Sequence, residues 1–405
     1  MPYRQLPHYF LLYLGALVAL GPVAMDAYLP ALPTMSEKLG VSIATLSTSV
    51  STFLVGFALG QLLGGPISDQ VGRKPVCLFG TVLFIATSAA ISASESASAI
   101  NLLRFTQAFG GGFASITAMA QVRDAYPAEE IGSRFATVMM VMMIAPVIAP
   151  IIGTGLLYLG WQAIFIFQVV YAVSLLAVMH QAIPETLQHQ KTPLSLPRIF
   201  YQYTAIVMHR THGHYLAALF ALSMGSTAGI LLIFVTHASF TYMTYFGVGE
   251  GVFSILFGLN AIGLIIANGL SSRLLKFCNP LRVFQNVVIL QTLATVLMAV
   301  LIYTNTLSLA MAVPLIVFIV SCVGVSNPAG AARFMAMFAP QQGGSAAAIQ
   351  LVAMFVLGSV MGALASVWHD GSLKPMVNTM LICAFISTAL LLPLRKLRDT
   401  YSGNS

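Results

Sequence analysis

Charged side chains are scarce in this sequence: Asp, Glu, Lys and Arg make up 7% of its 405 residues, whereas 58% are hydrophobic. A soluble domain usually carries about 25% charged residues. The scarcity therefore excludes a water-soluble protein and predicts an integral membrane protein. Cysteine is scarce as well, and the four cysteines lie far apart without a CxxC motif or a nearby His, so neither a metal site nor a disulfide framework is indicated.

The formal net charge is +7, which by itself could suggest a nucleic-acid partner. The basic residues are scattered among short loops, however, and do not gather on one soluble face. We therefore expect no nucleic acid, and we expect the positive charges to meet anionic lipid headgroups instead.

Apolar runs near the ~20 residues that a membrane span requires occur twelve times. The first is too long for a signal-peptide core and has a poor cleavage site at its Pro- and Asp-containing end, so it is expected to remain. The predicted spans are 8–30, 43–66, 75–94, 98–121, 131–155, 160–183, 213–236, 250–272, 282–303, 308–330, 342–367 and 374–394.

Lys and Arg accumulate in loops that stay on the cytoplasmic side. With the N-terminus inside, nearly all of the 18 Lys and Arg fall on the inner side, and only Lys38 and Lys374 fall outside. Both termini are therefore predicted to be cytoplasmic. The predicted domains are a six-helix bundle at 1–183, a linker at 184–212, and a second six-helix bundle with a short tail at 213–405.

Within the linker, apolar residues recur at helical spacing. This pattern predicts an amphipathic helix that either lies on the cytoplasmic membrane surface or covers the base of the bundle. The two alternatives are equally compatible with the stripe, which consists of Leu196, Ile199, Phe200, Tyr203, Ile206 and Val207.

Asp26 is the only acid at membrane depth; the other acids fall in loops, at span ends or in the tail. A carboxylate in hydrocarbon costs at least ~2.5–3.5 kcal/mol on insertion scales, so such residues usually face a wet cavity and mark a proton or substrate path. The alternative is a buried acid that only pairs with a neighbouring helix.

Arg104 is the second charge inside a span. Asp26 and Arg104 are both predicted to lie roughly 6–9 Å below the outer surface, at ~1.5 Å per residue. They form either a structural pair or a switch in which protonation of Asp26 releases Arg104; we favour the switch.

The loop after the second span reads Gly65-Pro-Ile-Ser-Asp69-Gln-Val-Gly72-Arg73-Lys74-Pro75. It resembles the G-x-x-x-D-x-x-G-R-K-P signature of the major facilitator superfamily. A simple topology loop would explain the basic pair, but not the acid or the paired glycines.

Four further stretches narrow the resemblance, three of them toward the Bcr/CflA branch of drug:proton antiporters. Leu102 to Gly110 is similar to the superfamily's helix 4 motif, with Ala108 in place of a glycine. The stretch Ala145-Pro146-Val-Ile-Ala149-Pro150-Ile-Ile-Gly153 is similar to the helix 5 antiporter motif. Asp26 to Pro33 and Gly160-Trp161 also match that branch, although Gln162 replaces the usual Arg.

The resemblance implies an all-α fold of two pseudo-symmetric six-helix bundles in the bacterial inner membrane, and proton-coupled export of drug-like small molecules by a monomer. Asp26 and Arg104 would couple protons. A cytoplasmic cluster would dock against the start of helix 11, near 341–345, in the outward-open state. The implied switch residues are Gly65, Asp69, Gly72, Arg73, Lys74, Arg123, Asp124, Pro146, Pro150 and Gly153.

With Asp26 as the single acid, we expect one proton per cycle and no resident cofactor, since the proton gradient drives transport. His237 could be a second titrating group, but a lone His near a helix end is more often a hydrogen-bonded surface residue. Residues that could line the cavity, each equally compatible with ordinary packing, are Met25, Gln107, Phe234, His237, Asn260 and Asn327.

Other functions fit less well. An exporter of an endogenous metabolite such as a siderophore, peptide or sugar would use the same fold, because fold does not fix cargo. An intramembrane enzyme would need a second acid, a nucleophile with a His, or a zinc motif, and none is present. A channel is disfavoured, since no polar ring or filter-like loop recurs.

Overall fold

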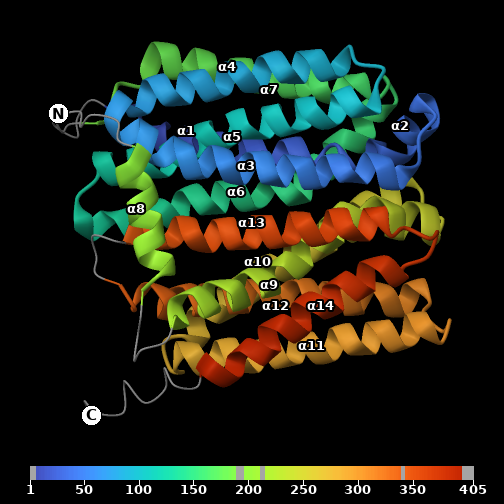
Figure 1. Cartoon of the computed structure of the whole chain (residues 1–405). Coiled ribbons are helices and arrows are strands. Elements are labelled where there is room, and N and C mark those ends of the chain that lie inside the picture. The colour runs from blue at the N-terminus through green and yellow to red at the C-terminus, as the bar shows by residue number, and fades with distance from the viewer. Residues whose placement is uncertain (1–5, 188–195, 210–214, 339–342, 395–405) are drawn as a thin grey trace. The chain divides into compact units, whose positions relative to one another are not determined.

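The computed structural model describes residues 6–187, 196–209, 215–338 and 343–394, and every regular element in these ranges is a helix (Figure 1). The chain forms two compact units. Unit 1 is Met1–Ser195 with Val248–Gly258, and unit 2 is Leu196–Gly247 with Leu259–Ser405. The helix α10 (Glu250–Leu274) therefore begins in unit 1 and continues in unit 2.

The other helices divide between the units. Unit 1 contains α1 (Phe10–Asp26), the 3₁₀ turn η2 (Leu29–Ala31), α2 (Leu32–Leu39), α3 (Ile43–Val71), α4 (Arg73–Ser92), α5 (Ala97–Ala125), α6 (Ala128–Leu157) and α7 (Gln162–Ala182). Unit 2 contains α8 (Leu196–Val207), α9 (Leu216–Ser239), the π-helical segment η3 (Phe240–Tyr245), α11 (Pro280–Tyr303), α12 (Leu309–Met335), α13 (Gly343–Val367) and α14 (Lys374–Leu394).

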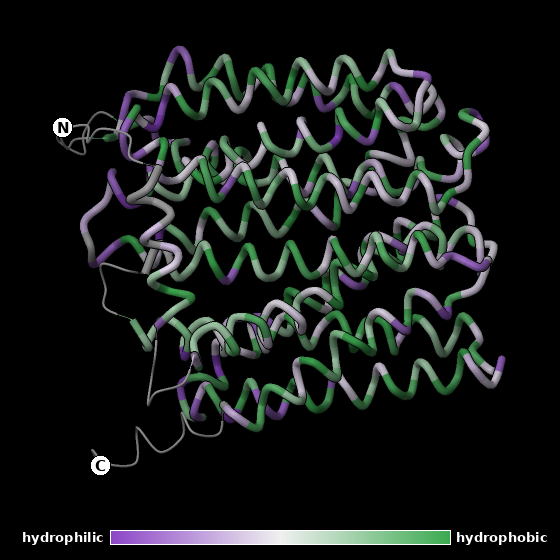
Figure 2. The backbone as a smooth tube through the Cα atoms, viewed as in Figure 1, coloured by the Kyte–Doolittle hydropathy of each residue, from purple (hydrophilic) through white to green (hydrophobic). Residues whose placement is uncertain are grey.

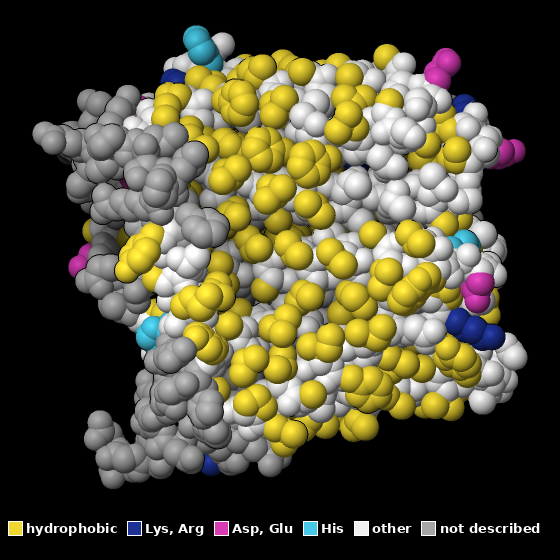
Figure 3. Space-filling model, viewed as in Figure 1, with side chains coloured by type: hydrophobic (Ala, Val, Ile, Leu, Met, Phe, Trp, Pro, Cys, Tyr) yellow, Lys and Arg dark blue, Asp and Glu magenta, His cyan; other side chains and the backbone are white. Residues whose placement is uncertain are grey.

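Eleven spans in the described ranges are long and apolar enough to cross a membrane, with α1 to α2 and α9 to η3 each counted as one. Helix α5 is the remaining long helix. It has 29 residues, as many as α3, but it is less apolar because it carries Arg104, Gln107 and Gln121. Apolar residues run along the helices and polar residues gather at their ends (Figure 2), and apolar side chains cover the helix surfaces (Figure 3). The described residues thus contain these eleven spans and the long helix α5, which covers the predicted span 98–121.

The first span is longer than predicted. Its predicted end at residue 30 is wrong, because the chain continues through η2 and α2 to Leu39. Pro30 has no N–H to donate to the carbonyl of Asp26, so the α-helix is interrupted there. A proline suits the first turn of the new helical segment, where its missing donor costs nothing. Asp26 consequently lies well inside the span and not four residues from its outer end.

Helix pairing repeats between the units. In unit 1, α1 packs against α6, α4 against α5, and α4 against α7. In unit 2 the equivalent pairs are α9 with α13, α11 with α12, and α11 with α14. The two sets of helices therefore share one internal packing scheme, as expected for two pseudo-symmetric bundles.

The C-terminal end of the short helix α8 packs against the core of unit 2. Ile206 is 1% exposed and packs with Leu216, Phe220 and Phe334 in the core of unit 2. Met208, just beyond the helix, remains exposed. This end of α8 therefore covers the bundle, which is one of the two alternatives; the membrane-surface role of the helix stays a prediction.

Candidate functional site

The interruption of α1 beside Asp26 frees a backbone acceptor inside the membrane span. In a regular α-helix the carbonyl of Ala24 would accept from the N–H of Tyr28. Tyr28 instead donates to the Met25 carbonyl (3.3 Å). The Ala24 carbonyl accepts from two side chains on other helices, Arg104 Nη1 at 3.2 Å and Gln168 Nε2 at 3.3 Å.

These donors belong to a set of hydrogen bonds that we call the Arg104 network, formed by Ala24, Arg104, Gln107 and Gln168. Gln107 Nε2 also donates to Ser88 Oγ of α4 (2.6 Å). Arg104 Nη1 also donates to Gln107 Oε1 (2.8 Å), and Gln107 Nε2 donates to Gln168 Oε1 (2.8 Å). The three side chains are fully buried. The network joins α1, α5 and α7 at the level of the α1 break.

Two aromatic rings hold the guanidinium group of Arg104. Its Cζ lies 4.5 Å from the ring centre of Tyr28 and 4.2 Å from that of Phe53. Tyr28 is itself fixed by a 2.9 Å hydrogen bond between its hydroxyl and Ser49. Arg104 Nε and Nη2 have no hydrogen-bond partner in the described part of the chain. The guanidinium group is therefore packed against two aromatic rings and hydrogen-bonded through Nη1. Its Nε and Nη2 atoms remain available as donors.

Asp26 occupies the last position of α1 and is 3% exposed. It is the only acid among the buried residues that the structure describes. No ion pair joins it to Arg104 within the described ranges. The acid and the base are therefore not paired in this conformation, and both the structural pair and the switch stay predictions.

The Pro-Gly motif of α6 lies against the same break. A Cβ atom on Gly153 would come within 2.1 Å of the Ala27 carbonyl oxygen, so only glycine permits this approach. Pro146 and Pro150 both lie inside α6. The Pro150 carbonyl accepts from Ser254 Oγ (3.0 Å), whose hydroxyl also lies 2.8 Å from that of Thr154. Gly153 of the motif thus contacts Ala27, the residue directly after the end of α1.

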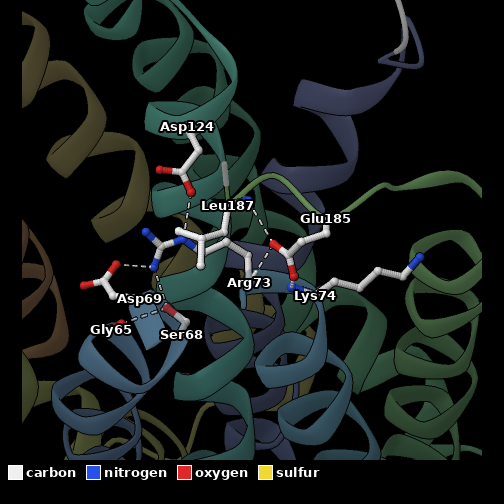
Figure 4. Close-up of polar contacts among 8 residues, drawn as sticks. All are labelled: Gly65, Ser68, Asp69, Arg73, Lys74, Asp124, Glu185 and Leu187. Carbon is white, nitrogen blue, oxygen red and sulfur yellow. Dashed lines mark hydrogen bonds and ion pairs between the residues drawn. The ribbon is translucent and has the colours of Figure 1, made fainter. Parts of the chain in front are cut away.

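A second polar site lies where α3, α4 and α5 meet (Figure 4). Arg73 Nε donates to Asp124 Oδ2 (2.8 Å), and Arg73 Nη1 bonds Ser68 Oγ (2.7 Å) and forms an ion pair with Asp69. Arg73 is 3% exposed although it lies at a helix start. We call Ser68, Asp69, Arg73 and Asp124 the Arg73 cluster.

Glu185 caps the N-terminus of α4 beside this cluster. Its Oε1 accepts from the backbone N–H of Arg73 (3.0 Å) and its Oε2 from that of Lys74 (3.1 Å). A carboxylate is favourable there because first-turn N–H groups lack partners and the helix dipole is positive. Gly72 permits this cap: its φ is +120°, and a Cβ would lie 2.5 Å from Glu185 Oε2.

Lys74 completes the connection between α4 and α7. Its Nζ donates to the carbonyls of Ile183 (2.8 Å) and His180 (3.1 Å) at the end of α7. Gly65 lies one turn before Asp69, and its carbonyl accepts from Ser68 Oγ. Arg123 is exposed, so the structure brings Asp124 into the cluster but not its neighbour. The predicted docking near 341–345 lies outside the residues whose side chains are described.

The predicted cavity residues are distributed over both units. In unit 1, Gln107 belongs to the Arg104 network, and Met25 is half-buried beside Asp26. In unit 2, His237 Nε2 lies 3.1 Å from the Gly362 carbonyl, and Asn327 Oδ1 accepts from Gln350 (2.9 Å).

Two other cavity candidates in unit 2 are buried. Phe234 packs edge-on against Tyr242, with ring centres 6.0 Å apart, and Asn260 is 3% exposed in α10. The role of all six residues in substrate binding stays a prediction.

Sequence reasoning missed Gln168, Ser88, Phe53 and Glu185. Each is a single residue outside any motif that we used. The one available signal was a polar side chain within an apolar run. Gln168 and Ser88 share this signal with many residues whose side chains only hydrogen-bond to the backbone of their own helix. Glu185 falls in the predicted linker, where an acid is ordinary and gives no sign of a specific role.

Comparison with known proteins gives one family. Residues 12–396 match the family model described as Major Facilitator Superfamily. The chain is 30% identical to a bicyclomycin resistance protein homolog of Haemophilus influenzae, over 93% of this chain and 94% of that protein. It is 29% identical to a chloramphenicol resistance protein of Pseudomonas aeruginosa, over 64% of this chain and 61% of that protein.

Among solved structures, the fold is similar to that of the peptide transporter POT in complex with sulfate. The TM-score is 0.75 at 12% sequence identity, and the match covers 98% of this chain and 97% of that one. At this identity the likeness concerns the fold alone.

Proposed function

Because the chain belongs to the major facilitator superfamily, whose members transport small molecules across membranes and are not enzymes, we propose that it exports drugs in exchange for protons. The relatives named for bicyclomycin and chloramphenicol resistance support export of drug-like, amphipathic molecules. Transport would proceed by alternating access in the inner membrane of a bacterium.

The observation that carries the proposal is the position of Asp26. Among the described residues it is the one buried acid, and it lies at a helix interruption, two residues from a carbonyl that accepts from the buried cation Arg104. A group that binds and releases one proton at this depth can exchange that proton for a substrate. Arg104, with two unused donors, is the partner toward which an ionised Asp26 would turn.

The second site would act on the conformational equilibrium. Gly65, Asp69, Gly72, Arg73, Lys74 and Asp124 would hold α3, α4 and α5 together at the cytoplasmic side, with both termini on that side. The α6 residues Pro146, Pro150 and Gly153 would control access at the α1 break. No resident cofactor and no partner subunit enter this proposal, in which a monomer uses the proton gradient directly.

A drug-susceptibility panel tests the proposal. A strain that overexpresses the chain should tolerate higher concentrations of at least one drug class than a strain that expresses equal amounts of Asp26→Asn. Unchanged susceptibility across the panel would favour an endogenous metabolite as the cargo. Equal protection by Asp26→Asn would remove Asp26 from the mechanism.

A further inference from the structure

Gln168 is a polar residue on the buried face of α7, which it shares with the apolar residues Phe165 and Ala172. Its neighbours on α7, Ile166 and Val170, are 53% and 63% exposed, whereas Gln168 is 0% exposed. The helix packs against α4 and α1, and the Gln168 amide reaches both α1 and α5. An amide of this size buried between helices in a membrane needs partners for its donor and its acceptor.

Chemistry fixes the direction of every hydrogen bond in the Arg104 network. Arginine only donates, so Gln107 must present Oε1 to Arg104 and Nε2 to Gln168. Gln168 must then present Oε1 to Gln107, which turns its Nε2 toward the Ala24 carbonyl, an acceptor only. Ser88 Oγ donates to the Phe84 carbonyl and accepts from Gln107 (2.6 Å), so it reinforces the same direction.

We propose that Gln168 is a positioning residue for proton exchange at Asp26, because it holds the Ala24 carbonyl at the α1 break whether or not Arg104 does. This inference rests on the proposed function. An ionised Asp26 would pair with the unused Nε and Nη2 of Arg104, and a shift of the guanidinium group toward it would lengthen the 3.2 Å bond from Nη1 to the Ala24 carbonyl. Gln168 Nε2 then remains as the donor that satisfies this carbonyl, which inside a membrane has no water to replace it.

The first variant is Gln168→Met, which keeps the length and shape of the side chain but removes both hydrogen bonds. Proton-driven export should lose about tenfold in kcat, because a buried acceptor is left without a donor during each cycle. The apparent KM for the drug should change by less than about threefold, since only the positioning of the exchange step is affected.

The second variant is Gln168→Glu, which keeps the size of the side chain and makes its hydrogen-bond donor depend on pH. A neutral carboxyl group donates through O–H and accepts through C=O, as the amide does, whereas a carboxylate only accepts. Export by Gln168→Glu, relative to wild type at the same pH, should therefore rise as the pH falls. Charged groups near this point are Asp26 of α1 and Arg104 of α5, and they interact with the new carboxyl group. The pH profile of Gln168→Glu is therefore also compared with that of Gln168→Met, which keeps both charged groups and adds none.

The control is Ser174→Ala, which removes a hydroxyl from the exposed side of α7, where it bonds the Tyr171 carbonyl of its own helix. It should transport like wild type at every pH. All variants are compared in proteoliposomes at equal protein content. A Gln168→Met protein with wild-type kcat, or a Gln168→Glu protein as impaired as Gln168→Met at every pH, would overturn the proposal. Failure of the proposed function is distinguishable, because the wild type itself would then show no proton-driven export.

Discussion

Asp26 and Arg104 were identified from the sequence because a charge inside hydrocarbon needs an explanation. The structure places both in the buried site, with the guanidinium group at the level of the turn that precedes Asp26. The absence of an ion pair between them in this conformation could not be predicted. Spacing along two helices gives the depth of each residue but not the direction of its side chain. Gln168 was not identified because an uncharged amide in a span costs less and has many ordinary uses.

At the residue scale, Gly153→Ala tests the contact between α6 and the α1 break. The new methyl group would overlap the Ala27 carbonyl, so we expect the free energy of unfolding to fall by about 1–3 kcal/mol. Thermal unfolding in detergent measures this change, and export assays should show a lower rate.

Gly155→Ala is the matched control, because this glycine lies on the same helix with nothing within 4 Å of the site of its Cβ. In the interior of a helix this change should be neutral or stabilising. Equal melting temperatures for the two variants would show that α6 does not approach α1 as closely as described.

At the element scale, the twelve helices were predictable because each requires a long apolar run, and most helix starts agree with the structure. The end of the first span was not predictable from Pro30. A proline ends a helix in many contexts, but here burial of Leu32 and Met35 continues the span beyond it. The cap on α4 was hidden for another reason, since Glu185 is separated from Arg73 by more than a hundred residues and no local pattern links them.

The α4 cap gives an element-scale prediction. In Glu185→Ala the backbone N–H groups of Arg73 and Lys74 lose their acceptor, because first-turn amides have none within the helix. We expect hydrogen–deuterium exchange at these two amides to accelerate about tenfold, as for loss of one charged hydrogen-bond acceptor. Export turnover should fall more than drug affinity, since the Arg73 cluster is then less firmly held.

The control for this experiment is Glu130→Ala. Glu130 pairs with Arg134 one turn away on the surface of α6. An exposed pair of this kind contributes little, so exchange in α4 and export should both stay unchanged. If α4 exchanges no faster in Glu185→Ala than in this control, Glu185 does not cap the helix in solution.

At the scale of the whole molecule, Asp26 is the single buried acid among the described residues, so under the proposed function it would set the charge that moves in each cycle. Exchange of one proton for a neutral drug moves one net charge, whereas exchange for a monocation moves none. The membrane potential should therefore add about 2.3 kcal/mol per 100 mV to export of a neutral drug. Export of a monocationic drug should not respond to it.

This prediction can be measured in proteoliposomes with potassium gradients and valinomycin at a fixed pH difference. Drugs of similar size and different charge serve as each other's controls. If a monocation responds to the potential as strongly as a neutral drug does, more than one proton moves per cycle, and a second titrating group such as His237 must take part.

The most direct test of the account is drug uptake into inverted membrane vesicles that hold equal amounts of wild type or Asp26→Asn. With an imposed pH gradient, acidic inside, the wild type should accumulate drug above the outside concentration. Asp26→Asn should insert normally yet accumulate none, because it lacks the group that exchanges a proton. Accumulation by Asp26→Asn equal to that of the wild type would contradict the central claim that Asp26 couples protons to export.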